Sequence, residues 1–242
     1  MTILKDWFTS WFNTPYYHIL YKHRDDTDAK VFMENITKFL KFKKETHILD
    51  LACGKGRHSV FLNSLGYQVT GIDLSENSIS FAQKFANKSL HFNVHDMRDA
   101  FTNQYDAIFN LFTSFGYFEE DAEDVKVLKN IKNGLHTNGI AVIDFLNVAT
   151  VQNHLVENEL QTIDGIEFRI HKKIKKGFII KEISFEADGK SHAYVEKVKY
   201  IDVEKFESYF KEAGLEIQHT FGDYQLSSFN EQTSNRLIYI VS

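Results

Sequence analysis

The residues best suited to chemistry stand where a short apolar run gives way to a glycine-rich turn. Asp50 comes directly before the turn, Gly54 and Gly56 lie within it, and a second aspartate, Asp73, ends the next apolar run. Glycines have no Cβ, so the backbone can bend sharply there and come close to a ligand. A carboxylate beside the turn attracts an ammonium group, and a carboxylate further on can hold a ribose diol through charge-assisted hydrogen bonds. These residue types predict a site for a nucleotide-like molecule that also carries positive charge.

An alternation of short apolar runs and helix-like segments must position these residues. Strand–helix repetition of this kind predicts an α/β fold, a Rossmann-like doubly wound sheet of seven strands with helices on both faces. Ligands of such sheets bind at the carboxyl ends of the strands, so we expect the residues that follow each strand to line one crevice. The predicted strands cover residues 48–51, 68–72, 90–94, 107–111, 140–145, 215–221 and 237–241. The predicted helices cover residues 56–65, 76–88, 120–134 and 202–213.

Two segments depart from this alternation. Residues 1–45 are rich in aromatic side chains and predict a helical N-terminal arm, or lid, with two helical pieces. Residues 148–200 start with a short predicted helix and continue as three runs rich in β-branched and aromatic residues, separated by turns that contain glycine. They predict an inserted three-stranded antiparallel sheet that caps the core. The core itself would comprise residues 46–147 and 201–242.

Dinucleotide-binding oxidoreductases use a related glycine turn. Their G-x-G-x-x-G fingerprint places a pyrophosphate on the N-terminus of the following helix. Here Ser59 occupies the position of the third glycine, and Asp50 would repel a pyrophosphate. Asp73 does not discriminate, because dehydrogenases carry an acid at this position too. An NAD-dependent dehydrogenase is therefore a less favoured alternative, which titration with both cofactors would test.

The stretch 50–58, Asp-Leu-Ala-Cys-Gly-Lys-Gly-Arg-His, closely resembles motif I of the class I S-adenosylmethionine-dependent methyltransferases, written D-x-x-C-G-x-G-R. The later strand ends are similar to the same family in order and spacing: Asp73 after the second strand, residues 95–98 after the third, 105–112 along the fourth and 135–140 before the fifth. The resemblance covers about residues 46–146. It implies S-adenosyl-L-methionine as the cofactor and S-adenosyl-L-homocysteine as the product.

The resemblance also assigns contacts with the cofactor. Asp50 would lie near the methionine amino group, Asp73 would hold the ribose, and Asp96 would meet the adenine amine with Met97 against the ring. Cys53 would be a small packing residue rather than a nucleophile. The complete set of expected cofactor contacts is Asp50, Ala52, Cys53, Gly54, Gly56, Arg57, Asp73, Leu74, Asp96, Met97, Asn110 and Leu111.

The arm, the insertion and the C-terminal segment look like the branch of the family that acts on small molecules, such as glycine, sarcosine and deoxysugar N-methyltransferases. In that branch the arm and the inserted sheet cap the cofactor crevice. Residues that could face the methyl acceptor are Tyr17, Tyr21, Asp144, Asn147 and Arg236. Four of them have a structural alternative, because the tyrosines could pack the arm onto the body, Asp144 could bond a neighbouring loop and Arg236 could form a surface ion pair. The acceptor, and the choice between nitrogen and oxygen, stay open.

Composition narrows the expected partners. The chain has 242 residues, a net charge of −5 and a pI near 6.1, which argues against broad contact with nucleic acid. A single cysteine fits the reducing cytoplasm, and no apolar run approaches the roughly 18 residues that a membrane span needs. No metal ion is expected, since the segment after the fourth strand has no acidic ligand. The oligomeric state is open, with a homodimer as one option. A cofactor-binding sensor or partner protein without turnover is the alternative to an enzyme.

Overall fold

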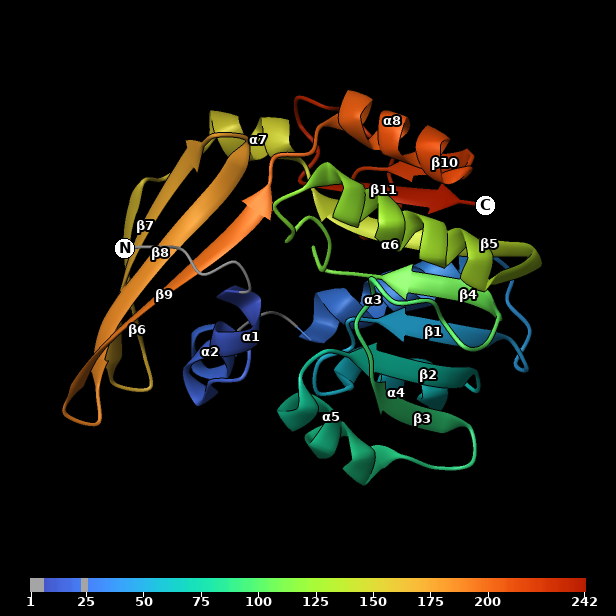
Figure 1. The fold of residues 1–242 in the computed structure, drawn as a ribbon, viewed down its shortest axis with the longest axis horizontal. Helices are drawn as coiled ribbons and strands as arrows, with labels where there is room; N and C mark the ends of the chain where they lie inside the picture. The colour runs from blue at the N-terminus through green and yellow to red at the C-terminus, as the bar shows by residue number, and fades with distance from the viewer. Residues whose placement is uncertain (1–6, 23–25) are drawn as a thin grey trace.

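The computed structural model describes residues 7–22 and 26–242, in which a large mixed sheet stands beside a smaller antiparallel sheet (Figure 1). Parts of the predicted arm, residues 1–6 and 23–25, lie outside the described residues. The helices are α1 (Trp7–Trp11), α2 (Pro15–Leu20), α3 (Asp26–Phe39), α4 (Arg57–Ser64), α5 (Glu76–Ala82), the 3-10 helix η1 (Gln83–Phe85), α6 (Asp121–Gly134), α7 (Val148–Asn153) and α8 (Val203–Ala213). The strands are β1 (His47–Leu51), β2 (Gln68–Asp73), β3 (Leu90–Val94), β4 (Tyr105–Asn110), β5 (Leu135–Leu146), β6 (Asn158–Ile163), β7 (Ile166–Lys175), β8 (Phe178–Ala187), β9 (Lys190–Lys199), β10 (Ile217–Phe221) and β11 (Arg236–Val241).

The main sheet confirms the predicted doubly wound architecture. Its seven strands run in the order β10-β11-β5-β4-β1-β2-β3, and the five strands from β5 to β3 are parallel. The chain winds outward from β1 to β2 and β3, then returns to place β4 on the other side of β1. Such a switch point opens a crevice at the carboxyl ends of the two central strands. The glycine turn follows β1 and therefore lies at this point.

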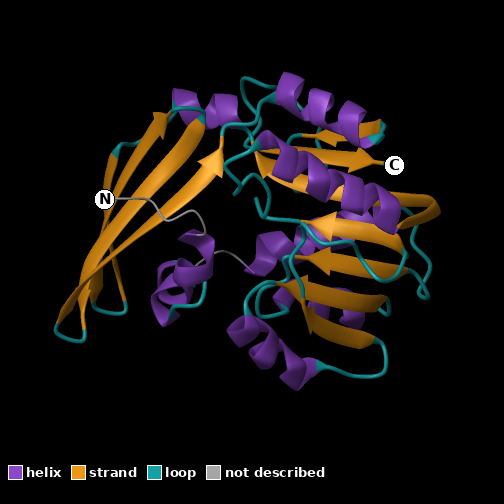
Figure 2. Cartoon of the chain, viewed as in Figure 1, coloured by secondary structure: helices purple, strands orange, loops and turns teal. Residues whose placement is uncertain are grey.

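Helices cover both faces of the main sheet, so its central strands are buried on both sides. Figure 2 shows α6 in front of the sheet and α3 and α4 behind it. The continuous apolar run of β1 fits this environment, since Ile48 and Leu49 are both 0% exposed. Ser75 begins α5 as an N-cap, where its hydroxyl accepts a 3.1 Å hydrogen bond from the backbone N–H of Ser78. The α-helix ends six residues earlier than predicted, because its last turn tightens into η1.

The inserted sheet has four strands rather than the predicted three. Its order is β6-β7-β8-β9, and every neighbouring pair is antiparallel. Asp164 and Gly165 both have positive φ, 52° and 79°, and so form a two-residue hairpin turn between Ile163 and Ile166. The run that was expected as one strand over 161–171 is therefore cut in two, and β6 begins at Asn158, inside what was expected as a helix over 149–157.

The N-terminal arm contains α1 and α2 and lies between the two sheets in Figure 1, with α3 following it. Within residues 7–22 and 26–46, three helices precede β1, where two helical pieces were predicted. Trp11 is completely buried, and its ring lies 4.5 Å from that of Tyr194 on β9. The arm is thus packed against the inserted sheet. No helix among the described residues is long and apolar enough to cross a membrane.

A buried ion pair fixes the far end of the inserted sheet to the core. Lys199, the last residue of β9, is 2% exposed and pairs with Asp124 and Asp121 of α6. The Asp124 side chain is 0% exposed, so each charge needs the other in order to stay buried. This contact sets where the inserted sheet leaves the core.

Candidate functional site

The glycine turn between β1 and α4 combines a tight bend with open space. Ala52, Gly54 and Gly56 have φ angles of 65°, 56° and 80°, in the left-handed region that favours glycine. A Cβ added to Gly54 would meet nothing within 4 Å, so this side of the turn is a cradle that a ligand can approach. A Cβ added to Gly56 would instead come within 2.6 Å of the Phe92 ring. The first glycine therefore leaves room for a ligand, and the second lets the turn pack against β3.

Cys53 anchors this turn to the sheet. Its backbone N–H donates to the carbonyl oxygen of Ile72 on β2 at 2.9 Å, and the residue is only 6% exposed. Burial raises the pKa of the Cys53 thiol far above its ordinary value, with the nearby carboxylates of Asp50 and Asp73 adding to the shift. A thiol that stays protonated is a poor nucleophile. The structure supports packing rather than catalysis as the role of Cys53.

Asp50 lies at the end of β1 and is almost completely buried. Burial raises the pKa of its carboxyl to about 6, although the hydroxyl of Ser59 donates a 2.5 Å hydrogen bond that favours the ionised form. Ser59 occupies the position of the third glycine in the dinucleotide fingerprint, and here it serves to orient this acid. A buried carboxylate that is held by hydrogen bonds from Ser59 is poised to accept a cationic partner.

Asp73 lies beside the glycine turn at the end of β2. One of its oxygens accepts a 2.8 Å hydrogen bond from the backbone N–H of Gly54, and the other accepts a 2.8 Å bond from the backbone N–H of Ser75. A carboxylate offers about four lone-pair sites, so two remain for hydroxyl groups of a ligand. Leu74 is 38% exposed and can cover a ligand at the same strand end. The Asp73 carboxylate, the expected ribose contact, is thus held in a fixed orientation.

The end of β3 carries Asp96 in an ion pair. The Arg98 guanidinium donates to both of its oxygens, with a shortest distance of 2.6 Å, and also pairs with Glu123 of α6 at 2.9 Å. Burial alone would favour protonation, but the bonds from Arg98 hold the pKa of the Asp96 carboxyl below its usual range. Met97 is half-buried beside it. Contact of Asp96 and Met97 with adenine stays a prediction, with Asp96 also fixing the local turn through the backbone N–H of Arg98.

Asn110 at the end of β4 has a buried acceptor. Its amide nitrogen donates to the carbonyl oxygens of Leu51 and Ser114, each at 3.3 Å. Among residues 7–22 and 26–242, nothing donates to its amide oxygen, although the residue is 0% exposed. An unsatisfied buried acceptor costs about 1–3 kcal/mol, so a donor on a ligand would relieve it. Contact of Asn110 and the neighbouring buried Leu111 with the cofactor stays a prediction.

The first two residues of α4 differ in their environments. Arg57 is exposed, and its guanidinium lies 2.9 Å from Nε2 of His58. The His58 ring stacks on Phe112 at 4.4 Å, and burial lowers its pKa to about 3, so it is neutral near pH 7. His58 is therefore a packing residue. Contact of Arg57 with the cofactor stays a prediction.

Three of the expected acceptor-side residues bond to other parts of the core. Asp144 on β5 is 0% exposed and pairs with Arg236 of β11, whose Nη2 lies 2.7 Å from its Oδ1. Asn147 caps α7, and its amide nitrogen donates to the carbonyl oxygens of Glu231 and Ser234 at 2.7 and 2.8 Å. The sequence offered a loop contact for Asp144 and a surface ion pair for Arg236 as alternatives. The backbone N–H of Phe112 supplies the loop contact, and the ion pair of Arg236 is with the buried Asp144 rather than at the surface.

The two expected tyrosines belong to the arm. The Tyr21 hydroxyl donates to the carboxylate of Glu196 on β9 at 2.7 Å, and the Trp11 indole donates to the same group at 2.7 Å. The Tyr17 ring packs edge-on against Trp11 at 5.7 Å and lies 5.0 Å from Tyr21. Glu196 was not among the predicted residues, since nothing in the sequence places an acid of the insertion opposite the arm.

The arm also reaches the cofactor end of the main sheet. The Ser75 hydroxyl, just after β2, donates a hydrogen bond to the side-chain oxygen of Asn13. Burial and, as a smaller cause, the positive charge of Lys55 in the glycine turn together lower the pKa of His18 on α2 to about 4. The arm therefore contacts both the inserted sheet and the strand ends where the predicted cofactor residues lie.

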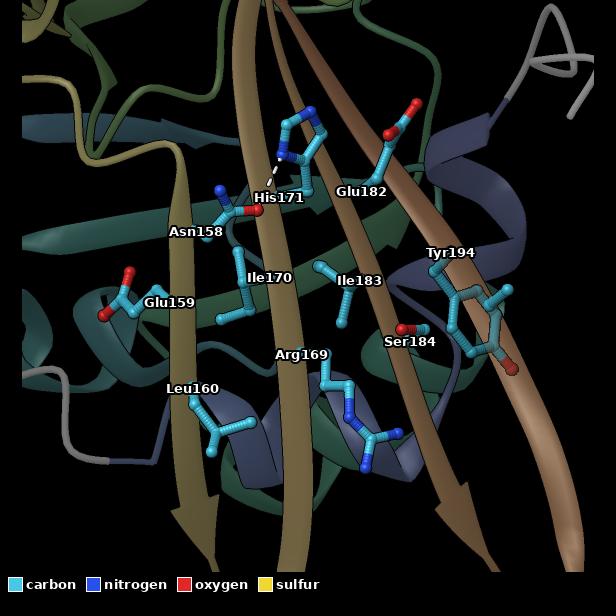
Figure 3. Close-up of a pocket in the computed structure, with 11 residues that line it drawn as sticks. Asn158, Glu159, Leu160, Arg169, Ile170, His171, Glu182, Ile183, Ser184 and Tyr194 are labelled. Atoms are coloured by element: carbon cyan, nitrogen blue, oxygen red, sulfur yellow. Dashed lines mark hydrogen bonds between the residues drawn. The ribbon is translucent and has the colours of Figure 1, made fainter.

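One hollow lies away from the strand ends. It measures about 750 Å³ and is lined only by residues of β6–β9, including Arg169, His171 and Ser184 (Figure 3). Figure 3 shows the helices of the arm behind this sheet. A smaller hollow of about 420 Å³ lies where Lys55 of the glycine turn faces helices α3, α4 and α5. The motif residues mark the strand ends, and not the larger hollow, as the candidate site.

Comparison with known proteins agrees with this geometry. Residues 42–214 match the family model described as "Methyltransferase domain". The putative methyltransferase YqeM of Bacillus subtilis (strain 168) is 39% identical over 101 residues, which are 40% of this chain and 41% of that protein. The chain thus matches less than half the length of that relative.

Two further similarities extend over most of the chain. The dTDP-3-amino-3,4,6-trideoxy-alpha-D-glucopyranose N,N-dimethyltransferase of Streptomyces venezuelae is 26% identical, over 72% of this chain and 77% of that protein. A solved S-adenosylmethionine-dependent methyltransferase of Clostridium acetobutylicum ATCC 824 shares the fold, with a TM-score of 0.79 at 19% identity over 94% of this chain and 95% of that one. With the glycine turn, the acids at the strand ends and the match over residues 42–214, the chain belongs to the methyltransferase domain family of S-adenosylmethionine-dependent enzymes.

Proposed function

We propose that this methyltransferase acts on an amino group of a small molecule, and that an amino sugar is the class of acceptor. One observation carries the proposal: the arm bonds to the inserted sheet through Glu196 and to the strand end through Ser75. Arm and sheet together form a cap beside the cofactor residues. The curated relative from Streptomyces venezuelae is named for dimethylation of an amino sugar, which supports this class.

The residues at the strand ends fit the cofactor. Asp73 would hold the ribose hydroxyls, Asp50 would face the ammonium group, and the open side of Gly54 leaves room for the cofactor to approach. Asn110 supplies a buried acceptor for a further donor. When bound, S-adenosylmethionine supplies a methyl group on a positively charged sulfur.

The protein's own contribution is placement and exclusion of water. An amine acceptor needs only its neutral form, so no strong base is required of the chain. Holding the acceptor in line and in a dry crevice supplies the rate enhancement. The Tyr21 hydroxyl and the Glu196 carboxylate are bonded to each other, so their role in this scheme is to hold the arm closed.

Several features of the whole protein belong to the same proposal. We propose residues 1–45 and 148–200 as the lid and cap of a core formed by residues 46–147 and 201–242. A net charge of −5 supports a protein that does not bind nucleic acid, and the single cysteine supports a cytoplasmic location. A homodimer is the oligomeric state that we would test first, by light scattering.

The decisive experiment is an acceptor panel. Purified protein is incubated with S-adenosylmethionine and paired acceptors that differ only in an amino or a hydroxyl group, on nucleotide sugars and on simple amines. Formation of S-adenosylhomocysteine is measured. We expect turnover with amino sugars, at a rate that rises with pH as the acceptor amine loses its proton. Equal turnover of the hydroxyl analogues, or turnover of simple amines alone, would contradict the proposed acceptor class.

A further inference from the structure

The segment that follows β4 has a strained backbone. Phe112 and Thr113 have φ angles of 57° and 63°, two consecutive left-handed residues without a glycine. This conformation is unfavourable for residues with a Cβ and is exceptional for a β-branched side chain such as threonine. It persists only where the surrounding structure holds it in place, and such sites cluster where proteins act on ligands.

Asp144 and Arg236 hold this strained turn. The buried Asp144 carboxylate accepts a 2.8 Å hydrogen bond from the backbone N–H of Phe112, and its own carbonyl accepts a 3.0 Å bond from the N–H of Thr113. Arg236 donates to Asp144 through Nε at 2.8 Å and to the Thr113 hydroxyl through Nη2 at 3.0 Å. The pair thus bonds both left-handed residues from one side.

Two tyrosines complete the arrangement. The Tyr224 hydroxyl donates to Asp144 at 3.3 Å, and its ring lies 5.6 Å from the Arg236 guanidinium. On the other side of the turn, the Tyr117 hydroxyl donates to the Thr113 carbonyl at 2.6 Å. Burial raises the pKa of the Asp144 carboxyl, and the bonds from Arg236, Phe112 and Tyr224 oppose that shift.

The turn also contacts the cofactor end of the fold. Asn110, just before it, bonds the carbonyl of Leu51 at the end of β1, and His58 of α4 stacks on the Phe112 ring at 4.4 Å. The strained residues therefore lie at the switch point between β1 and β4, against the glycine turn. The resemblance assigned Asn110 and Leu111, at the end of the fourth strand, to the cofactor, whereas Asp144 and Arg236 were expected to face the acceptor.

We propose that Asp144 and Arg236 are positioning residues, which hold the Phe112–Thr113 turn in its left-handed conformation as the wall of the cofactor site. They exchange no proton with the substrate and form no bond to it. The ion pair keeps the backbone of this turn in place. A relaxed turn, right-handed or extended, would move the wall toward or away from the cofactor. This proposal rests on membership of the methyltransferase family and is independent of the proposed acceptor class.

The test uses S-adenosylhomocysteine as the probe and isothermal titration calorimetry as the readout, so no acceptor is needed. Arg236→Lys keeps the charge but loses the planar fork that reaches Asp144 and Thr113 together. We expect its dissociation constant to rise by about 10- to 100-fold, since one or two charge-assisted hydrogen bonds are lost. Thr113→Val removes only the acceptor for Arg236 and should show a smaller rise. Lys129→Gln, in an exposed ion pair with Glu212, is the matched control and should bind as the wild type does.

A rescue variant separates positioning from general support of the fold. Glycine adopts positive φ without strain, so adding Thr113→Gly to Arg236→Lys should bring the affinity back to within about 3-fold of Thr113→Gly alone. Amide hydrogen exchange at Phe112 should be faster in Arg236→Lys and slower again in the double variant. Wild-type affinity in both Arg236→Lys and Thr113→Val would overturn the proposal. The proposal would also be overturned if Arg236→Lys lost affinity and the added Thr113→Gly failed to restore it. The Asp144–Arg236 pair would then only support the fold.

Discussion

The buried carboxyl of Asp50 predicts that cofactor affinity depends on pH. Burial raises its pKa from 3.8 to about 6 in the free protein, against the opposing hydrogen bond from Ser59. An ammonium group bound beside Asp50 would favour the ionised carboxylate and lower this pKa again. Only the ionised fraction of the free protein is then ready to bind, so affinity should fall as pH falls through about 6.

The size of the effect follows from that pKa of about 6. Roughly a tenth of the free protein has an ionised Asp50 at about pH 5, and nearly all of it does at about pH 7.5. The apparent dissociation constant increases in proportion as the competent fraction shrinks. For S-adenosylhomocysteine we therefore expect about a tenfold weaker affinity at about pH 5 than at about pH 7.5, which is about 1.4 kcal/mol.

Calorimetric titrations across this pH range measure the effect. Asp50→Asn should bind more weakly and lose the pH dependence, and Ser59→Ala should move the midpoint to higher pH because a bond to the ionised form is removed. His18 and His58, with pKa values of about 4 and about 3, are neutral throughout and do not contribute. A constant affinity between these pH values in the wild type, or an unchanged pH dependence in Asp50→Asn, would refute the reasoning.

The same shift has a consequence for folding in the absence of cofactor. The folded chain keeps its proton on Asp50 at pH values where the unfolded chain, with a pKa near 3.8, has lost it. Binding of that proton favours the folded state. The contribution of Asp50 to stability is therefore fully present below about pH 4 and is lost as pH rises through about 6.

Three substitutions test other parts of the structure. Asp73→Ala should weaken binding of S-adenosylhomocysteine by roughly 1.5–3 kcal/mol, because hydrogen bonds to a charged group are lost, and an unchanged calorimetric affinity would remove Asp73 from the ribose site. Gly56→Ala should lower the free energy of unfolding by at least about 1 kcal/mol. Its φ is 80° and its new Cβ would meet the Phe92 ring at 2.6 Å, so a urea unfolding curve identical to that of the wild type would contradict this packing. Lys199→Met should cost about 3–5 kcal/mol in the same assay by leaving the Asp124 charge buried without its partner, and a loss below about 1 kcal/mol would show that the pair adds nothing.

The core and its strand ends could be predicted from the sequence because their signals are local. A buried parallel strand is a continuous apolar run, and the residues that follow it project into the crevice whatever the rest of the chain does. Asp50, Gly54, Gly56 and Asp73 lie together for this reason. The fourth strand of the insertion was missed because the sequence of β6 does not follow its burial pattern, with Leu160 on the exposed face, and only the left-handed turn at residues 164–165 separates it from β7.

The contacts that could not be predicted join residues far apart in the sequence. Asp144 and Arg236 are 92 positions apart, and their pairing depends on the register of β5 and β11, which no local pattern reveals. The bond between Tyr21 and Glu196 spans 175 positions and depends on how the arm crosses the inserted sheet. In both cases the residue type was recognised as functional, but its partner was decided by tertiary packing.

The arm and the inserted sheet are hydrogen-bonded to each other, and this limits how such an enzyme can change its substrate. Trp11 and Tyr21 share Glu196, and Tyr16 donates a 2.6 Å hydrogen bond to Asp188 at the turn between β8 and β9. Replacing the arm alone would leave these carboxylates without their donors from the arm, and replacing the inserted sheet alone would leave the arm's donors without these acceptors. Exchange between relatives should therefore succeed only when residues 7–22 and 158–199 are transplanted together, while the glycine turn and its acids stay with the host. The arm and the inserted sheet would then be inherited together, although residues 46–147 of the core separate them in the sequence.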